Sequence, residues 1–356
     1  MQTQEMKTVF VVMKNNFSSF LKTVMEAGYS IAAPLYKDKI LDFGFTNDVN
    51  DIVLSDELPY KSPKEFFFPQ QEKLISFDLE GNLESYAEGL KLRPFVLLGV
   101  KPCDLQALEV VKKIFLDWKY TDPYFNERTK NSIVFGKGCN IKKKGCFCDE
   151  RNINLNFSSK CDVFIRETDS EYLFEAITEK GNVFLKNFLP EEPRSTFIDD
   201  KVVPSSPSSD DIKELKLDIN EDELFSRESW ETLSEKCLGC GMCTYICPTC
   251  HCFGFRDAEE NGKQIRYRCW DSCMYPRFTL HASGHNPRIS RKERFRQRVM
   301  HKYSYVKKNT GMIACTGCGR CIRSCPGGMN IKTVVKKLME EKHPKSMKAG
   351  MEANNG

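Results

Sequence analysis

Short apolar runs alternate with amphipathic stretches over the first 200 residues, which is the pattern of a mixed α/β domain. The run TVFVVM at 8–13 predicts a strand. Residues 17–27 repeat apolar side chains at helical spacing and stop before Gly28, so this segment predicts a helix.

A βαβ unit is predicted over 94–139. The continuous apolar run at 94–100 is typical of a buried strand, and 131–139 is predicted to be the strand that follows. Between the two strands we expect a helix at 105–116 with Asp104 as its N-cap.

Helical patterns dominate the second half of the chain. A helix is predicted at 211–236, and Ser290 with Glu293 forms a capping box that opens a helix to about residue 308. Asn330 is expected to cap a last helix. The predicted organisation is an α/β domain at 1–202, a Pro/Ser-rich linker at 203–211, an α-helical domain at 212–342 and a flexible tail at 343–356.

Composition raises the question of what the cysteines do. The chain has 356 residues, a formal net charge of +4 and 17 cysteines. No apolar run approaches the length of a membrane span, and the N-terminus lacks the build of a signal peptide, so we expect a cytoplasmic protein. Cysteines of cytoplasmic proteins stay reduced, so their number indicates metal binding rather than disulfides.

Two copies of the pattern C-x2-C-x2-C-x3-C-P stand at 237–248, the first clamp, and at 315–326, the second clamp. Bacterial ferredoxins bind [4Fe–4S] clusters with this spacing, and the fourth Cys of each run ligates the other cluster. A pair of zinc ribbons is the alternative, although each zinc site takes two C-x-x-C pairs. The predicted first cluster is held by Cys237, Cys240, Cys243 and Cys325. The predicted second cluster is held by Cys315, Cys318, Cys321 and Cys247.

The α/β domain offers a third group of thiols, Cys103, Cys139, Cys146 and Cys148. The first two follow successive strands of the βαβ unit, so both are expected at the same edge of a parallel sheet. The other two lie in a short loop further on, and the group can hold a third [4Fe–4S] cluster. The lysines at 137 and 142–144 could offset its negative charge. A zinc site and buried thiols without metal are the alternatives.

Five further cysteines fit no metal pattern. Cys161 is expected to be structural. The others lie in PTCHCF and RCWDSC, and we expect them to pack beside the first cluster, with a fourth metal site as the alternative. These four are Cys250, Cys252, Cys269 and Cys273.

The motifs together resemble one family, which contains the dicluster [4Fe–4S] protein of anaerobic sulfite reductase and the archaeal sulfhydrogenase beta subunits. The resemblance covers roughly 55–330. The motifs that carry it are PYKSPKEFFFPQQEKL at 59–74, KPCDLQAL, the C-x6-C-F-C pattern at 139–148, CPTCHC at 247–252, WDSC at 270–273, and HNPR followed by RxRxxHK within 285–302.

The resemblance implies an iron–sulfur electron-transfer subunit of a multi-subunit oxidoreductase. Its implied partners are a catalytic subunit of hydrogenase, sulfite reductase or heterodisulfide reductase type and an FAD/NAD(P)H-binding flavoprotein subunit, with ferredoxin as a further candidate. It also supports the third group of thiols as cluster ligands. The sequence shows no dinucleotide or FAD fingerprint, no nickel-binding cysteine pairs and no sirohaem pattern, so we expect no flavin, no NAD and no catalytic residues in this chain.

Two hypotheses from other classes stay open. The chain could be a reductase with its own substrate-binding cluster at the third group of thiols. The arginine-rich stretch at 256–308 raises the possibility of a nucleic-acid module, but the net charge is small. We instead expect these arginines to balance anionic clusters or to dock an acidic partner, and we expect neither nucleic acid nor a membrane as a partner.

Overall fold

The computed structural model describes residues 7–78, 80–86, 93–189, 194–196 and 219–341. An eight-stranded sheet forms the centre of the N-terminal half, in the order β10-β1-β9-β8-β7-β6-β2-β3. Strands β2, β6, β7 and β8 are parallel, and the strands on either side of them pair antiparallel. The bounds are β1 (Lys7–Met13), β2 (Ser30–Lys37), β3 (Ile40–Thr46), β6 (Phe95–Val100), β7 (Ser132–Lys137), β8 (Val163–Glu167), β9 (Glu171–Ala176) and β10 (Arg194–Thr196).

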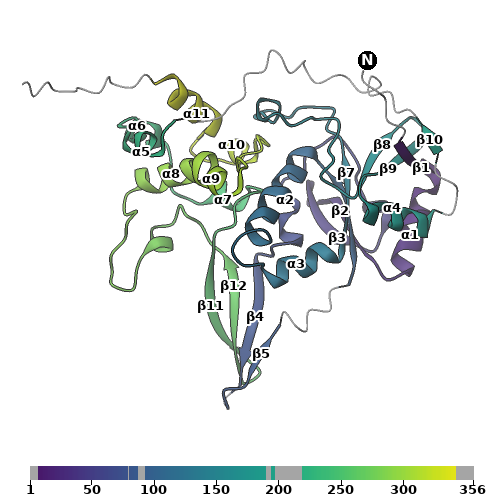
Figure 1. Ribbon diagram of the computed structural model, residues 1–356, viewed down its shortest axis with the longest axis horizontal. Helices are drawn as coiled ribbons and strands as arrows, with labels where there is room; N and C mark the ends of the chain where they lie inside the picture. Colours follow the sequence, from purple (N-terminus) through teal and green to yellow (C-terminus); the bar gives the residue numbers. More distant parts are fainter. Residues whose placement is uncertain (1–6, 79, 87–92, 190–193, 197–218, 342–356) are drawn as a thin grey trace, which may run out of the picture.

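Helices cover both faces of this sheet (Figure 1). Helices α1 (Phe17–Glu26) and α4 (Glu179–Phe188) pack on one face, and α2 (Pro102–Phe115) and α3 (Pro123–Lys130) pack on the other. Alternation along β6 explains the three layers, because Val96 and Leu98 face the first pair of helices while Phe95 and Leu97 face the second.

The predicted βαβ unit is therefore confirmed, with one correction. Helix α2 begins at Pro102, and Lys101 rather than Asp104 is its N-cap residue. Proline suits the first helical position because the missing N–H has no partner there. Asp104 lies in the first turn of the helix, and its carboxylate accepts a hydrogen bond from Arg320 instead of capping the helix.

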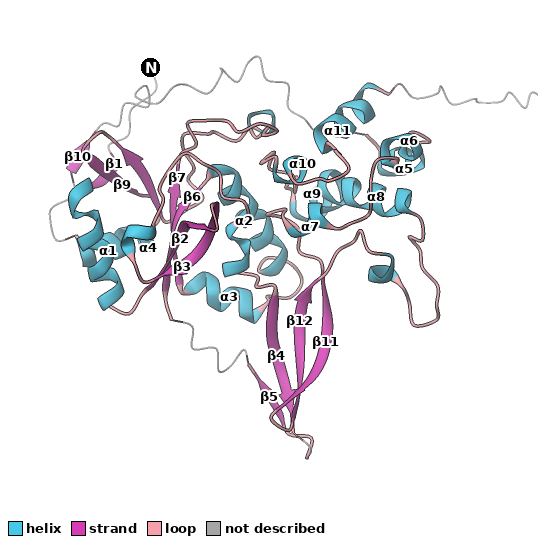
Figure 2. Ribbon diagram, turned by 180° about the vertical axis from the view of Figure 1, so that it is seen from behind, coloured by secondary structure: helices cyan, strands magenta, loops and turns pink. Residues whose placement is uncertain are grey.

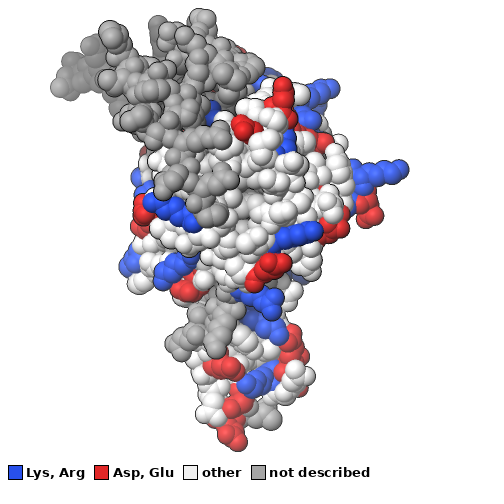
Figure 3. Space-filling model, turned by 90° about the vertical axis from the view of Figure 1, so that its right-hand side faces the viewer, with Lys and Arg blue, Asp and Glu red and all other residues white. Residues whose placement is uncertain are grey.

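A second sheet connects segments that are far apart in the sequence. Its order is β11-β12-β4-β5, all antiparallel, and it projects from the body of the molecule (Figures 1 and 2). Positive and negative side chains are interspersed along this projection in Figure 3. The bounds are β4 (Gln71–Phe77), β5 (Leu83–Ser85), β11 (Phe253–Glu260) and β12 (Lys263–Trp270).

The hairpin of β11 and β12 corrects the expectation of a purely α-helical C-terminal domain. The segment between the clamps contains the two strands of this hairpin as well as helices, and β12 pairs with β4 from the N-terminal half. Strand β11 is largely exposed and carries few apolar residues, so the sequence gives little alternation from which to predict it.

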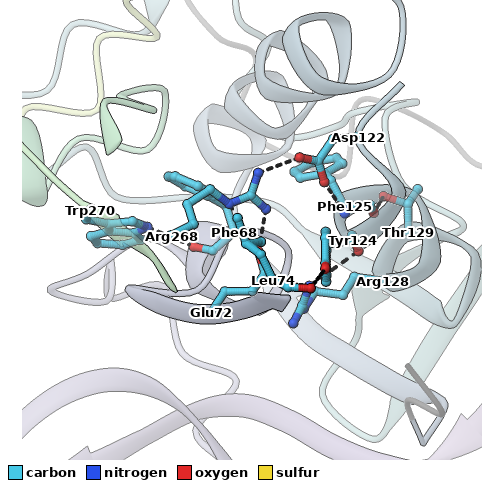
Figure 4. A network of polar contacts seen from close by, with 10 residues as sticks. All are labelled: Phe68, Glu72, Leu74, Asp122, Tyr124, Phe125, Arg128, Thr129, Arg268 and Trp270. Carbon is cyan, nitrogen blue, oxygen red and sulfur yellow. Dashed lines mark hydrogen bonds and ion pairs between the residues drawn. The ribbon is translucent and has the colours of Figure 1, made fainter. Parts of the chain in front are cut away.

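A buried arginine fixes the base of this second sheet (Figure 4). Arg268 on β12 donates to the carboxylates of Glu72 on β4 and Asp122 at the N-cap of α3. Arg128 on α3 donates to the same Glu72. Trp270 donates its indole N–H to the carbonyl of Phe68 at 3.1 Å. These contacts tie the projecting sheet to the helix layer of the first sheet.

Short helices surround the two clamps. The predicted helix at 211–236 is instead two helices, α5 and α6, and its residues 211–218 lie outside the described part of the chain. The bounds are α5 (Glu221–Ser226), α6 (Trp230–Ser234), α7 (Met242–Tyr245), α8 (Arg291–Met300), α9 (Val306–Thr310), α10 (Arg320–Arg323) and α11 (Ile331–Glu340). Short 3-10 helices lie at Lys14–Asn16, Val49–Asp51, Pro63–Phe66, Asp149–Arg151 and Pro276–Thr279.

The capping predictions are confirmed at both C-terminal helices. Ser290 and Glu293 form the capping box of α8, and a π-helical turn at His301–Tyr305 continues this helix into α9. Asn330 caps α11. The predicted linker at 203–211 and the tail at 343–356 lie outside the described residues.

Apolar contacts join the two halves of the chain. Val110 on α2 packs with Val306 on α9 and with Ala314 just before the second clamp. A separate core around Trp230, Val299 and Leu338 holds the C-terminal helices together. None of the described helices combines the length and apolar character needed to cross a membrane.

Candidate metal centres

The first predicted ligand set surrounds a cavity. Cys237, Cys240 and Cys243 of the first clamp line it together with Cys325 from the second clamp. Met274, Phe295 and Met329 complete an apolar wall, and Cys321 also reaches the cavity. The backbone N–H of Met329 lies 3.3 Å from the sulfur of Cys325. The fourth cysteine of the first clamp, Cys247, is not among the residues that line this cavity.

Cys247 instead lies with the second clamp. Its thiol interacts electrostatically with Cys318 and Cys321, and burial raises the pKa of these two thiols to about 11 and about 12. The ammonium group of Lys302 is 3.0 Å from the sulfur of Cys247 and 2.8 Å from the hydroxyl of Thr249. Burial alone would lower the pKa of Lys302, but the neighbouring thiols raise it above its ordinary value.

Several buried polar atoms at this place have no hydrogen-bond partner among the described residues. They are the Nε of Arg298, the hydroxyl of Tyr303 and the hydroxyl of Thr316. Tyr303 interacts with the thiol of Cys315, which Thr316 follows directly in the chain. Buried donors and a cation beside thiols fit an anionic group, because unpaired buried donors are otherwise costly. The second ligand set therefore fits a cluster of iron and sulfide held by thiolates.

The third group of thiols also converges. Cys103 lies in the first turn of α2, directly after β6, and Cys139 follows β7. Cys103, Cys148 and Cys318 pack in one cluster with Leu58, and Cys146 packs against it. Burial raises the pKa of Cys148 to about 12, and the charges of Cys146 and Cys139 contribute to this shift. The four thiols thus meet at the carboxyl edge of the parallel strands, next to Cys318 of the second clamp.

Two cations beside the third group, Lys101 and Arg323, are not among those expected from the sequence, and the guanidinium of Arg323 lies 3.4 Å from the sulfur of Cys146. Lys137 pairs with Glu167 at 2.8 Å, and Lys142 pairs with Asp149 at 2.6 Å. Lys101 interacts electrostatically with Cys139 and Cys103, and its ammonium group donates to the carbonyls of Ser55 at 2.7 Å and Gly138 at 3.0 Å. Burial lowers the pKa of Lys101 to about 8, while the charge of Cys139 opposes this shift.

The loop that carries Cys146 and Cys148 docks on the second clamp. The N–H of Phe147 donates to the carbonyl of Gly317 at 2.7 Å, and the sulfur of Cys146 lies 3.2 Å from the carbonyl of Cys318. Arg151 donates to the carbonyl of Cys315 at 3.1 Å. The third group and the second ligand set therefore share one interface.

Four cations lie buried near the second ligand set, and of these only Arg298 belongs to the arginines that the sequence leads us to expect beside a cluster. Arg320 pairs with Asp104, and Arg298 and Lys302 are buried near Cys247. Lys64 reaches the same region from the N-terminal half and donates to the carbonyl of Cys250 at 2.7 Å. Cationic residues are normally predicted to be exposed, so only the structure identifies these as buried.

Several arginines of the stretch at 256–308 support the fold. Arg266 pairs with Asp257 at 2.8 Å, and Arg268 forms the network described above. Arg294 donates to the carbonyls of Met274 and Ile289, at 2.9 and 2.6 Å. The guanidinium groups of these three arginines are therefore engaged within the protein and are not available to phosphates.

The spacing of the described ligands bears on a single metal ion as well. Among the described residues, no group of three or more Cys, His, Asp or Glu side chains is placed to hold one. Zinc requires four ligands at about 2.3 Å in a tetrahedron, whereas thiolates around a four-iron cluster stand farther apart.

Comparisons with known proteins agree with this geometry. Residues 236–329 match the family model described as a 4Fe-4S dicluster domain. Sulfhydrogenase 2 subunit beta of Pyrococcus furiosus is 28% identical over 341 residues, which cover 91% of this chain and 96% of that protein. No solved structure matches the chain. The two matches confirm the predicted resemblance to the sulfhydrogenase beta-type family.

Proposed function

We propose that the chain is the iron–sulfur electron-transfer subunit of a multi-subunit oxidoreductase. The observation that carries this proposal is the continuity of the thiol groups. The cavity lined by the first ligand set also receives Cys321, which belongs to the second set. Cys318 of the second set in turn packs against Cys103 and Cys148 of the third group. A carrier needs such a series of centres, whereas a storage site needs only one.

The proposed ligand sets follow from this arrangement. The first cluster is held by Cys237, Cys240, Cys243 and Cys325. The second cluster is held by Cys315, Cys318, Cys321 and Cys247. The third cluster is held by Cys103, Cys139, Cys146 and Cys148. When bound, [4Fe–4S] clusters supply one-electron redox chemistry.

The protein's own groups position the thiols and adjust their electrostatic surroundings. Lys302 places a positive charge 3.0 Å from the sulfur of Cys247. Arg298 lies near Cys243 and Cys321, between the first and second ligand sets. Positive charge beside an anionic cluster favours its reduced form, so both residues are expected to raise the reduction potential there.

The proposed partners come from the resemblance. The relative is a sulfhydrogenase beta subunit, so we infer that this chain also works as one subunit of a larger complex. We propose a flavoprotein subunit that binds FAD and NAD(P)H on one side and a catalytic subunit on the other. In this proposal the chain itself binds neither flavin nor NAD and carries electrons between the two.

Anaerobic iron and acid-labile sulfide analysis of the isolated chain tests the proposal. The two clamps and the third group together predict at least about 12 iron per chain. EPR-monitored reductive titration should resolve a separate reduction step for each cluster. Iron near zero, with zinc in its place, would contradict the proposed function.

Substitution of one third-group thiol separates that group from the clamps. Cys148→Ser should remove about four iron per chain and leave the clamp signals in place. Cys161→Ser is the matched control, because Cys161 is an equally buried thiol that precedes β8 and packs in the core between the first sheet and α2. The isolated chain, supplied with reduced viologen, should not reduce sulfite or polysulfide. Turnover that Cys148→Ser abolishes would favour the reductase hypothesis instead.

A further inference from the structure

Three cysteines outside the proposed ligand sets meet at the base of the β11–β12 hairpin. Cys252 stands directly before β11, and Cys273 follows shortly after β12. The register pairs Phe253 with Trp270, and the N–H of Asp271 donates to the carbonyl of Cys252 at 2.9 Å. Hairpin pairing therefore brings the segments of Cys252 and Cys273 together.

The three thiols lie close enough to interact. Cys273 is buried in the C-terminal core, and Cys252 packs against that core. The thiols of Cys252 and Cys273 interact directly, and electrostatic interactions connect both with Cys250. Cys250 in turn contacts Cys247 of the second ligand set.

Buried cations surround this group. Lys64, Lys302 and Arg298 are only 3%, 3% and 4% exposed. Lys64 donates to the carbonyl of Cys250 at 2.7 Å, and its ammonium group lies 4.0 Å from the centre of the Trp270 ring. Within the described ranges, none of the three forms an ion pair with a carboxylate.

These cations require negative charge nearby. A buried ammonium or guanidinium without a counter-charge is strongly unfavourable. Protonated thiols carry no charge, so they cannot supply it, whereas metal-bound thiolates can. The second cluster can balance Lys302, which touches Cys247. Lys64 lies at Cys250, where burial lowers its pKa and the charges of Cys250, Cys247 and Cys252 oppose that shift, so negative charge on these thiols would favour the charged ammonium.

We propose that Cys250, Cys252 and Cys273 hold a further iron–sulfur cluster beside the second one. Thiolates are soft ligands that select iron–sulfur clusters, zinc or Cu(I). We favour the cluster because no described group has the arrangement of a single-ion site and because the surrounding cations suit a larger anion. This replaces the expectation that the three thiols only pack beside the first cluster. It extends the proposed electron carrier by one centre.

Cys269 is not part of this site, although the sequence groups it with the other three. It is adjacent to Trp270 on β12, and successive side chains of a strand point to opposite faces. Trp270 faces Lys64 and Phe68, so Cys269 points away from them. Cys269→Ser is therefore a matched control for substitutions at the site.

The test compares metal content between the wild-type chain, the double variant C252S/C273S and the control C269S, all purified anaerobically. We expect the double variant to lose about three or four iron with matching sulfide, while C269S equals the wild type. The EPR signals of the other clusters should persist in the double variant. Unchanged iron in a folded double variant would overturn the inference. A loss of one zinc with unchanged iron would also overturn it.

The iron content of the wild-type chain distinguishes a failure of this inference from a failure of the proposed function. About 12 iron in both the wild type and the double variant would overturn only the further cluster. Fewer than about 8 iron in the wild type would overturn the proposed carrier itself. If the double variant does not fold, Lys64→Met provides the test because it keeps every thiol. We expect one reduction step to shift to lower potential in Lys64→Met, and unchanged potentials in all steps would contradict the inference.

Discussion

The guanidinium of Arg320 donates two hydrogen bonds to the carboxylate of Asp104, at 2.5 and 2.8 Å. The two side chains are 1% and 0% exposed. Arg320 opens α10 inside the second clamp, and Asp104 follows Cys103 of the third group. The Nε of Arg320 also donates to the carbonyl of Pro59 at 3.1 Å. One buried ion pair thus joins the segments that carry two of the proposed centres.

Removal of one partner from this pair should destabilise the protein strongly. Asp104→Asn would leave a buried guanidinium without its counter-charge, which costs about 3–5 kcal/mol. For a chain of this size that cost corresponds to a fall of roughly 4–7 °C in Tm. Differential scanning calorimetry of the anaerobic, cluster-loaded protein would measure the change.

An exposed ion pair provides the control for this prediction. Lys113 and Asp117 pair at 2.7 Å, but their side chains are 47% and 53% exposed. Asp117→Asn should therefore change stability by less than about 1 kcal/mol. Equal Tm values for Asp104→Asn and Asp117→Asn would show that the buried pair does not hold the two segments together.

Substitution of Cys325 should damage the cluster of the first clamp, although Cys325 belongs to the second. Cys325 lines the cavity of Cys237, Cys240 and Cys243. Cys325→Ser is expected to change the EPR signal and potential of that cluster and to lower iron by up to about four per chain. Cys247→Ser should have the same effect on the other cluster. If both substitutions affect the cluster of their own clamp, the crossed ligation is wrong.

Replacement of Gly317 by alanine should separate the third group from the second clamp. Gly317 has φ +68°, and an added Cβ would lie 2.6 Å from the backbone of Phe147 and Cys148. The loop would have to move, so we expect Gly317→Ala to lose about four iron from the third site. Iron and sulfide analysis with EPR would detect this loss.

Gly328 separates the effect of backbone strain from that of the close approach. It has φ +65°, but an added Cβ would meet nothing within 4 Å. Gly328→Ala should therefore cost only the roughly 1–2 kcal/mol of a left-handed alanine and keep all its iron. Equal iron loss in both variants would attribute the effect to strain and not to docking of the loop.

The sequence predicted the parts of the fold whose signals are local. Strand β6 is a continuous apolar run, and the Ser290 capping box marks the start of α8 within four residues. Strand β11 depends on pairing with β12, which in turn pairs with β4 about 190 residues earlier, and its own residues are mostly exposed. Periodicity carries no information about such a partner.

The same distinction applies to the candidate sites. The spacing within each clamp identifies its cysteines as ligands, because three thiolates of one cluster come from one short loop. The charges around them come from distant segments. Lys64 is separated from Cys250 by 186 residues, and Arg320 is separated from Asp104 by 216. Buried cations of this kind could not be distinguished from surface lysines and arginines by their sequence context.

Neutralisation of Lys302 should lower the reduction potential of the second cluster. Its ammonium group lies 3.0 Å from the sulfur of Cys247, and the residue is 3% exposed. Loss of one positive charge next to a ligand sulfur, with an effective dielectric constant near 20, is worth roughly 3 kcal/mol. For a one-electron couple this corresponds to a shift of the order of 100 mV. Lys302→Met keeps the length of the side chain, and EPR-monitored potentiometry would measure the shift.

Lys308→Met is the control for this prediction. The side chain of Lys308 is 72% exposed, so solvent screens its charge and all potentials should stay within about 20 mV. A potential that does not fall in Lys302→Met would mean that Cys247 does not ligate the second cluster.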